Sequence, residues 1–346
     1  MKTIKLLACA ALAAACMAGF TGCSKKDYSK PKVAEGTVLA LAVRSPEQTS
    51  LAPLVEKYKL NDNTAALKSM PKEMKEFFEK LELDKVETKW ALVTIGGEID
   101  KDKVAAGKIP DIACVFATTL DLDKVVTEFE NTAKGSDKPE FKKTTIAGVS
   151  AYEITSKGGD KIVPCAASLD GKLIICASSA AVLEKQIALY RDGKGESSDF
   201  SSFAVAGNDI LRVKAVKVGE IVQKVLPDPS LLKGANEVME GGDKIVQGLA
   251  SVEIGLSASD DGKDIKLDVT VETASDADAE KLITAAKGGL AMATAAAQQG
   301  AAKDEEAKAA LGVLESAKAV NEGKAAKLTA AAPAEPLLQF VSKMIK

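Results

Sequence analysis

The chain has 346 residues and a formal net charge of −3, with no histidine and only 4% aromatic residues. The absence of histidine excludes Ser-His-Asp and Cys-His nucleophile pairs, histidine general bases and the commonest ligands of zinc, copper and iron. The mildly acidic charge gives no basic footprint for nucleic acid, and scarce aromatic side chains leave few stacking platforms for bases or sugars. The length suggests about two domains.

A short basic head and an apolar run open the chain. Lys2 and Lys5 precede an apolar run over residues 6–19, followed by small residues, Cys23 and the polar sequence "SKKD". This order is typical of a secretory signal peptide, and the run is shorter than the roughly 20 apolar residues that a membrane-spanning helix needs. Residues 1–22 are therefore predicted to be a signal peptide.

The four residues "FTGC" that end at Cys23 resemble the lipobox of bacterial lipoproteins, although Phe20 stands where the pattern prefers an aliphatic residue. The resemblance implies that Cys23 is acylated and becomes the mature N-terminus, so that membrane lipid is a partner through Cys23. In a Gram-negative cell, Ser24 would then permit transport to the periplasmic side of the outer membrane. Acylation at Cys16, an ordinary cleaved signal and an uncleaved anchor remain alternatives. Residues 23–36 are predicted to be the lipidated cysteine and a flexible tether.

Residues 37–204 are interpreted as a first α+β domain with an extra hairpin, because apolar runs of strand length alternate with helical stripes. In chain order, the expected elements are a strand at 37–44, helices after Ser50 and Pro71, strands at 89–96 and 111–118, a helix at 122–129, a strand at 149–155, a hairpin within 161–179 and a helix at 180–190.

Residues 205–346 are interpreted as a second α+β domain with a C-terminal helix. The expected elements are a strand at 209–216, a helix at 218–226, strands at 249–257 and 263–272, an alanine-rich helix that begins with a capping-box-like Ser275 and Asp278, a strand at 324–333 and a helix over 334–345. The strands at 249–257 and 263–272 alternate apolar and polar residues, so their apolar face should be covered while the other face meets water. The C-terminal helix is expected to pack on the sheet, with a membrane-surface role as the alternative.

Both halves show the order βαββα(β), which is the split βαβ order of ferredoxin-like folds. The tandem arrangement resembles duplicated α+β lipoproteins of unknown function in bacterial envelopes. The predicted fold class is therefore α+β, with two tandem βαββα(β) repeats, mainly antiparallel sheets and helices packed on one face. This resemblance rests on pattern, and it implies a fold and no active site.

Few polar groups are arranged as a catalytic site would require. Carboxylate pairs at predicted helix starts complement the helix dipole, and a third pair lacks the bidentate glutamate of a calcium loop. Ser-x-x-Lys occurs about as often as chance predicts, without the Lys-Thr-Gly or Ser-Asp-Asn that penicillin-binding enzymes add. The carboxylate pairs are Asp121/Asp123, Asp276/Asp278 and Asp100/Asp102, and the Ser-Lys pairs are Ser29/Lys32, Ser69/Lys72 and Ser230/Lys233. No catalytic residue, cofactor or metal site is predicted.

Three cysteines lie in the part of the chain that is expected to fold, Cys114, Cys165 and Cys176. If Asp170 and Gly171 form the two-residue turn of a hairpin, Cys165 and Cys176 face each other as a hydrogen-bonded pair with Cα atoms about 5.5 Å apart. An oxidising envelope would favour a disulfide between them. Buried free thiols, or a bridge that involves Cys114, remain alternatives.

Three functions are compatible with these observations. The first is a non-catalytic binding or structural module of the cell envelope that presents a surface to another envelope protein. The second is a lipoprotein that binds a small molecule or lipid in a cleft between the two repeats, because clefts between domains favour pockets. The third is an envelope enzyme that uses carboxylates or a Ser-Lys pair.

Overall fold

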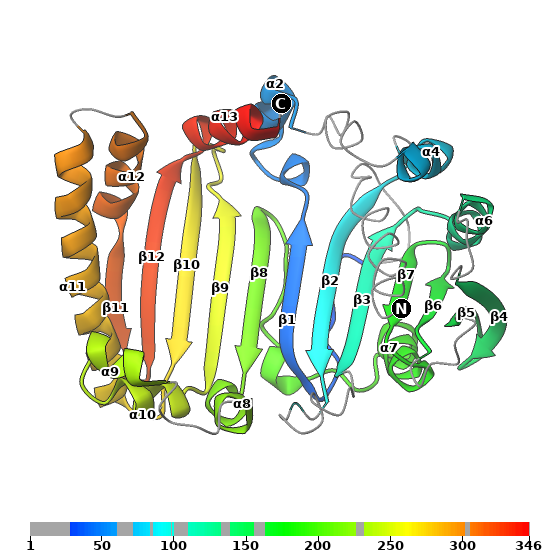
Figure 1. Ribbon diagram of the computed structural model, residues 1–346, viewed down its shortest axis with the longest axis horizontal. Coiled ribbons are helices and arrows are strands. Elements are labelled where there is room, and N and C mark those ends of the chain that lie inside the picture. Colours follow the sequence, from blue (N-terminus) through cyan, green and yellow to red (C-terminus); the bar gives the residue numbers. More distant parts are fainter. Residues whose placement is uncertain are drawn as a thin grey trace.

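A computed structural model describes residues 28–60, 72–83, 86–97, 99, 110–132, 139–155, 163–225, 232–301 and 305–345. These residues form one continuous sheet of 12 strands in the order β11-β12-β10-β9-β8-β1-β2-β3-β7-β6-β5-β4 (Figure 1). Neighbouring strands are antiparallel throughout, and β11 and β4 are the two edges. The mainly antiparallel α+β fold class is thus confirmed.

The first half of the sheet contains the elements expected from the sequence and one strand that was not expected. The elements are β1 (Thr37–Arg44), η1 (Pro46–Gln48), α2 (Ala52–Tyr58), α4 (Lys72–Lys80), β2 (Thr88–Gly96), β3 (Asp111–Thr118), α6 (Leu122–Thr132), β4 (Glu140–Ile146), β5 (Val149–Thr155), β6 (Cys165–Leu169), β7 (Leu173–Ala177), α7 (Ala180–Asp192) and η3 (Ser198–Phe200). The unexpected strand is β4, an edge strand whose sequence EFKKTTI is largely polar.

The second half also alternates strands and helices. Its elements are β8 (Asp209–Val216), α8 (Val218–Val225), α9 (Lys233–Val238), α10 (Gly242–Gln247), β9 (Ser251–Ala258), β10 (Asp264–Glu272), α11 (Asp276–Ala301), α12 (Glu305–Ser316), β11 (Lys318–Glu322), β12 (Ala325–Pro333) and α13 (Ala334–Ile345). The short helices α9 and α10, the helix α12 and the edge strand β11 were not expected.

The internal repeat is visible in the strand order, but the order is not that of a split βαβ unit. The run β1-β2-β3-β7-β6 in the first half corresponds to β8-β9-β10-β12-β11 in the second, and β4 and β5 extend the first half. A split βαβ unit keeps its first two strands apart, whereas here β1 and β2 pair directly and antiparallel, with Leu41 opposite Val93. The two halves join through the β1–β8 ladder, so they share one sheet.

Helices pack on both faces of the first half, which corrects the expectation of a single helical layer. One face carries α7, and the core beneath it, here called the α7 core, includes the buried side chains Trp90, Leu183 and Ile187. The opposite face carries α4 and α6, whose Phe77 and Val125 pack in a separate α4–α6 core. Strands of the first half, such as β2 and β3, are therefore buried on both faces.

Residues 28–36, which the sequence assigned to a flexible tether, are packed onto the α7 core. Trp90 Nε1–H donates to the Tyr28 carbonyl at 2.7 Å, and the Lys32 N–H donates to Tyr190 Oη at 2.9 Å. Val33 and Ala34 are only 2% and 6% exposed. An aromatic and aliphatic patch therefore holds this segment, and the predicted flexible tether is wrong for residues 28–36.

Helices of the second half lie around the margins of the sheet rather than across its middle (Figure 1). At one end, Val55 of α2 and Ala334 at the start of α13 pack with Ala258 and the half-buried Ile265. At the other end, Ala279 and Ile283 of α11 pack with Ala326. Among the described helices, none crosses the centre of β8, β9 and β10.

Candidate functional site

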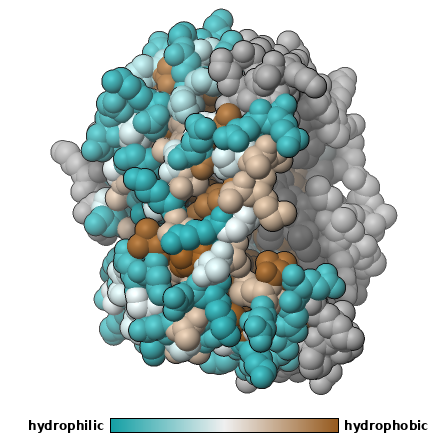
Figure 2. All heavy atoms as spheres, turned by 90° about the vertical axis from the view of Figure 1, so that its left-hand side faces the viewer, coloured by the Kyte–Doolittle hydropathy of each residue, from teal (hydrophilic) through white to brown (hydrophobic). Residues whose placement is uncertain are grey.

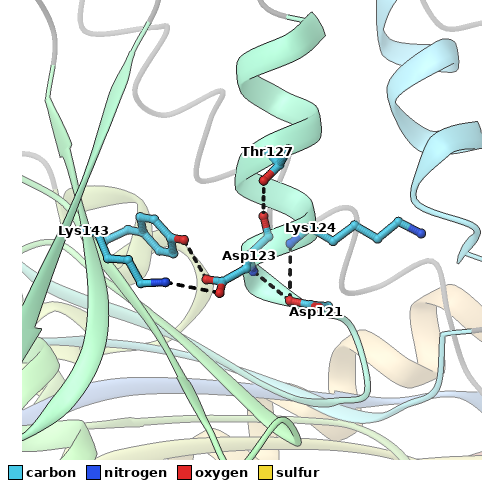
Figure 3. A network of polar contacts seen from close by, with 6 residues as sticks. Asp121, Asp123, Lys124, Thr127 and Lys143 are labelled. Carbon is cyan, nitrogen blue, oxygen red and sulfur yellow. Dashed lines mark hydrogen bonds and ion pairs between the residues drawn. The ribbon is translucent and has the colours of Figure 1, made fainter.

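The carboxylate pair Asp121 and Asp123 serves the start of α6, as its position predicted. The N–H groups of Asp123 and Lys124 donate to Asp121 Oδ1 at 2.9 and 3.3 Å (Figure 3). Asp121 is therefore an N-cap that satisfies two of the unpaired donors at the helix start.

Asp123 ties α6 to the β4–β5 hairpin. Its carboxylate accepts a hydrogen bond from Tyr152 Oη at 2.6 Å and lies 3.3 Å from Lys143 Nζ (Figure 3). The Tyr152 hydrogen bond holds the pKa of Asp123 below its usual value, and burial together with this bond raises the pKa of Tyr152 to about 12. Near neutral pH, the charged carboxylate of Asp123 thus faces the neutral phenol of Tyr152 and the ammonium of Lys143. This arrangement links α6 to the β4–β5 hairpin, and neither Asp123 nor Tyr152 is placed to exchange a proton near that pH.

Acid should weaken this link. Because the pKa of folded Asp123 is lowered, its contribution to stability is present above the unfolded value of about 3.9 and is lost as the pH falls through the folded pKa. We expect the stability difference between wild type and Asp123→Asn to be largest at pH 6–7 and to vanish near pH 2–3, as measured by urea unfolding. A difference that stays constant over this range would contradict the link.

The other polar candidates are structural or lie outside the described residues. Ser275 Oγ donates to Asp278 Oδ2 at 2.7 Å and accepts from the Asp278 N–H at 3.2 Å, which confirms a cap at the start of α11. Asp100, Asp102, Ser69 and Ser230 lie outside the described residues. Within the described ranges, no three side chains of cysteine, aspartate or glutamate are grouped as a metal site would require.

The predicted disulfide between Cys165 and Cys176 is wrong, because the hairpin register differs by one residue. Asp170 and Gly171 both have positive φ, 53° and 63°, and the Lys172 N–H donates to the Leu169 carbonyl at 3.0 Å, as in a tight two-residue turn. The ladder then resumes with Leu169 opposite Leu173, so Lys172 is an extra residue on one strand. A shift of one residue sends alternate side chains to opposite faces.

The two cysteines consequently lie in different cores. Cys165 pairs with Ala177 and packs in the α7 core, whereas Cys176 pairs with Ala166 and packs in the α4–α6 core. None of the three described cysteines forms a disulfide, and Cys114 stands directly opposite Cys176 across the β3–β7 ladder. Burial raises the pKa of Cys165 to about 11, which removes the thiolate that a nucleophile needs.

Alkylation followed by mass spectrometry checks this register. After denaturation without reductant, we expect Cys165 to be fully alkylated and no peptide to link Cys165 with Cys176, because the sheet separates the two thiols. A linked peptide that contains both residues would show that the sequence-based register was right. A Cys165→Ser variant with unchanged alkylation at Cys114 and Cys176 is the matched control.

A recess of about 520 Å³ lies beside α8, on the charged face of the second half. Its lining includes the basic residues Lys214 and Lys217 and the acidic residues Asp199, Glu220 and Glu272. Glu272 already accepts a hydrogen bond from Ser251 at 2.7 Å, and Lys214 lies 3.8 Å from Glu253. Charges of both signs that are partly paired with protein groups give this recess no preference for one class of ligand.

The opposite face of the second half is apolar, and the part of the chain that the structure describes places no helix over its centre. An unbroken row crosses six strands, in which each side chain stands directly opposite the next across a ladder: Val93, Leu41, Val213, Ile254, Val269 and Leu328. On either side of this row lie Leu39, Leu211, Leu256 and Leu267. These ten residues, here called the open face, are half-buried, and none belongs to a core cluster.

The two faces of β8, β9 and β10 differ sharply in polarity. The face away from the row carries Arg212 and Glu253, joined at 2.8 Å, together with Lys266 and Asp268, so it meets water as the alternating pattern predicted. The same pattern predicted a cover for the apolar face, and the described helices cover only its ends. Figure 2, viewed from the side that bears α11 and β11, shows a largely hydrophilic surface with smaller hydrophobic groups between the hydrophilic ones.

The open face is the site that sequence reasoning missed. The alternation of β9 and β10 predicted an apolar face that must be covered, but it did not indicate what covers that face. Aliphatic surface gains about 25 cal/mol per Å² when it leaves water, so a row that no described helix covers is a surface for binding apolar groups.

Comparisons with known proteins add no functional information. No family model matches this chain, and no curated protein matches it. A solved structure described as crystal form III of TP0453 is 9% identical, with a TM-score of 0.39 and coverage of 90% of this chain and 96% of that chain. The chain is thus weakly similar to that structure.

Proposed function

We propose that this chain is a lipid-anchored cell-envelope protein whose folded part is a non-catalytic module that binds the hydrocarbon chain of a lipid on the open face. The anchor is supported by the signal-peptide order and the lipobox-like "FTGC" that ends at Cys23. The binding role is supported by one observation, the unbroken aliphatic row on a sheet face whose centre no described helix covers. No described helix is long and apolar enough to cross a membrane.

The composition of the open face favours hydrocarbon over protein. Its residues are all leucine, isoleucine or valine, as in Leu41, Val213 and Ile254. Protein interfaces are instead enriched in aromatic residues, methionine and arginine, and the residues that dominate their affinity are mostly tryptophan, tyrosine and arginine. A surface of branched aliphatic groups without hydrogen-bonding side chains offers a partner only dispersion and burial, which suits a saturated chain.

The length of the row also fits a single acyl chain. Adjacent strands are about 4.8 Å apart, so the five steps from Val93 to Leu328 span about 24 Å. One leaflet of a bilayer holds its chains within about 15 Å, half of a hydrocarbon core of about 30 Å. An extended acyl chain could therefore lie along the row with all of its carbons in contact with aliphatic side chains.

The polar groups support a non-catalytic role. Asp121 and Ser275 cap helices, and Asp123 joins α6 to a hairpin. These three are among the carboxylate and hydroxyl candidates of the sequence, and their hydrogen bonds are made to other groups of the fold. We therefore propose a module that holds its ligand without reacting with it.

Titration with a fluorescent fatty acid tests the proposal. The mature chain carrying Cys23→Ser, so that no acyl group of its own is present, should bind cis-parinaric acid saturably. Saturated fatty acids should displace it, with affinity that rises with chain length, and should raise the unfolding temperature by mass action. No binding, or binding without dependence on chain length, would contradict the proposal. In that case, an envelope protein whose capture is abolished by Val269→Asn would support the protein-binding alternative.

A further inference from the structure

We infer that residues 28–35 form a fixed seat that places the side of the first half that bears α7 against the headgroup layer of the anchoring membrane. The inference rests on the proposed acylation of Cys23 and adds which side of the protein meets the bilayer. It contrasts with the flexible tether that the sequence predicted, because a free linker would leave the folded part without a preferred side.

The seat is held by main-chain groups as well as by burial. Tyr190 Oη accepts from the Lys32 N–H at 2.9 Å and donates to the Lys32 carbonyl at 3.1 Å, so one buried hydroxyl satisfies both groups of that residue. The Glu35 N–H donates to the Gly195 carbonyl at 2.8 Å. These hydrogen bonds hold residues 28–35 in place, because detaching the segment would leave each of these main-chain groups without its hydrogen-bond partner in the protein.

The first seated residue also packs by its side chain. Tyr28 Oη donates to Asp170 Oδ2 at 2.9 Å, and its ring meets that of Tyr190 edge to face, with centroids 6.4 Å apart. The Tyr190 ring in turn stacks on Trp90, with centroids 6.1 Å apart. The chain is therefore fixed from Tyr28 onward.

The remaining chain between lipid and seat is short. Five residue steps separate Cys23 from Tyr28, and an extended chain spans at most about 3.6 Å per residue, so the two lie within about 18 Å of each other. This distance is smaller than the long dimension of a strand of eight residues, about 26 Å. The protein body therefore cannot turn a remote side toward the bilayer that holds its lipid.

The surface around the seat suits headgroups rather than the hydrocarbon core. Beside Tyr28, the residues Ser29 and Lys30 are exposed, and Asp170 lies in the adjoining turn. Among the described residues, the large hydrophobic side chains that are exposed all lie in the second half: Val225, Val238, Met292, Val320 and Leu337. The seat thus rests on the membrane surface without inserting, and the open face lies on the other side of the sheet from the α7 core.

Energy transfer from Trp90 tests the seat, because Trp90 is the single tryptophan and lies directly beneath Tyr28. The acylated full chain is reconstituted in phosphatidylethanolamine and phosphatidylglycerol vesicles that carry a dansyl headgroup. We expect strong transfer in wild type. Inserting 20 glycine and serine residues after Ser24 gives a spacer with a root-mean-square length of about 27 Å, and transfer should fall by half or more.

The outcomes separate the seat from the anchor. Intact-mass analysis first shows whether Cys23 carries an acyl group, and its absence would remove the anchor and the seat together. If Cys23 is acylated, equal transfer in wild type and the insertion variant would overturn the seat while leaving the anchor in place. A second variant, Tyr190→Phe, keeps the natural length between Cys23 and Tyr28 but removes the hydroxyl that binds Lys32. We expect it to lower the energy transfer from Trp90 to the dansyl headgroups.

Discussion

Val269→Asn should weaken the binding of a saturated fatty acid by tenfold or more. Val269 is the fifth of the six residues of the row, opposite Ile254 on one side and Leu328 on the other, so a chain that lies along the row covers it. When the acyl chain covers an asparagine, the side-chain amide loses its hydrogen bonds to water and gains no other partner, which costs about 1–2 kcal/mol or more. A loss of about 1.4 kcal/mol in binding free energy is a factor of ten in affinity. Displacement of cis-parinaric acid measures the change.

Asp268→Asn is the matched control for that variant. Asp268 is the preceding residue of β10, is exposed and points to the charged face. It places the same new side chain on the same strand without touching the open face, so binding should stay within twofold of wild type. Urea unfolding of both variants shows that the fold is retained. Equal weakening by the two substitutions, or by neither, would remove the open face as the binding surface.

Gly219→Ala should lower the free energy of unfolding by about 3 kcal/mol. Gly219 is the second residue of α8 and approaches the chain that follows α10, donating its N–H to the Leu249 carbonyl at 2.8 Å. An added Cβ would lie 2.0 Å from the Gln247 carbonyl oxygen and 2.6 Å from its carbon. Because both are main-chain atoms, α8 must move away from its neighbour, and overpacking of this kind costs about 1–3 kcal/mol or more. Urea unfolding gives the value.

Gly288→Ala tests the same substitution where space is open. Gly288 lies within α11, and a Cβ there would meet no atom within 4 Å. Alanine is the better helix former, so this variant should gain about 0.5–1 kcal/mol. If the free energy of unfolding falls in Gly219→Ala and rises in Gly288→Ala, the loss comes from the close main-chain contact at Gly219. A neutral Gly219→Ala would show that α8 does not pack as the structure has it.

Elements that depend on local pattern were predicted well, and the neighbours of each strand were not. The strict alternation of β9 and β10 and the stripe of α6 follow from the burial of one face, which the sequence records directly. Pairing of β1 with β8 joins residues such as Leu41 and Val213 that are far apart in the chain. Nothing in the periodicity of either strand specifies its partner, so the order βαββα(β) suggested a split βαβ unit that the sheet does not contain.

Two features of the candidate sites depend on contacts that the local sequence does not specify. The turn at Asp170 and Gly171 was read correctly, but the extra residue Lys172 shifted the ladder and placed Cys165 and Cys176 in separate cores. The polar composition of residues 24–36 suggested a tether, while the contacts that seat Tyr28 come from Trp90, which lies 62 residues away. A contact of that kind has no signature in the segment itself.

Photo-crosslinking with a diazirine-bearing palmitic acid tests the central claim most directly, because it marks the residues that the hydrocarbon touches. In the mature chain with Cys23→Ser, we predict that labelled peptides come from β8, β9 and β10 and carry the adduct on Val213, Ile254 or Val269, with labelling abolished by excess unlabelled fatty acid. Saturable labelling confined to the recess beside Lys214 and Glu272, or no competition at any site, would contradict the account.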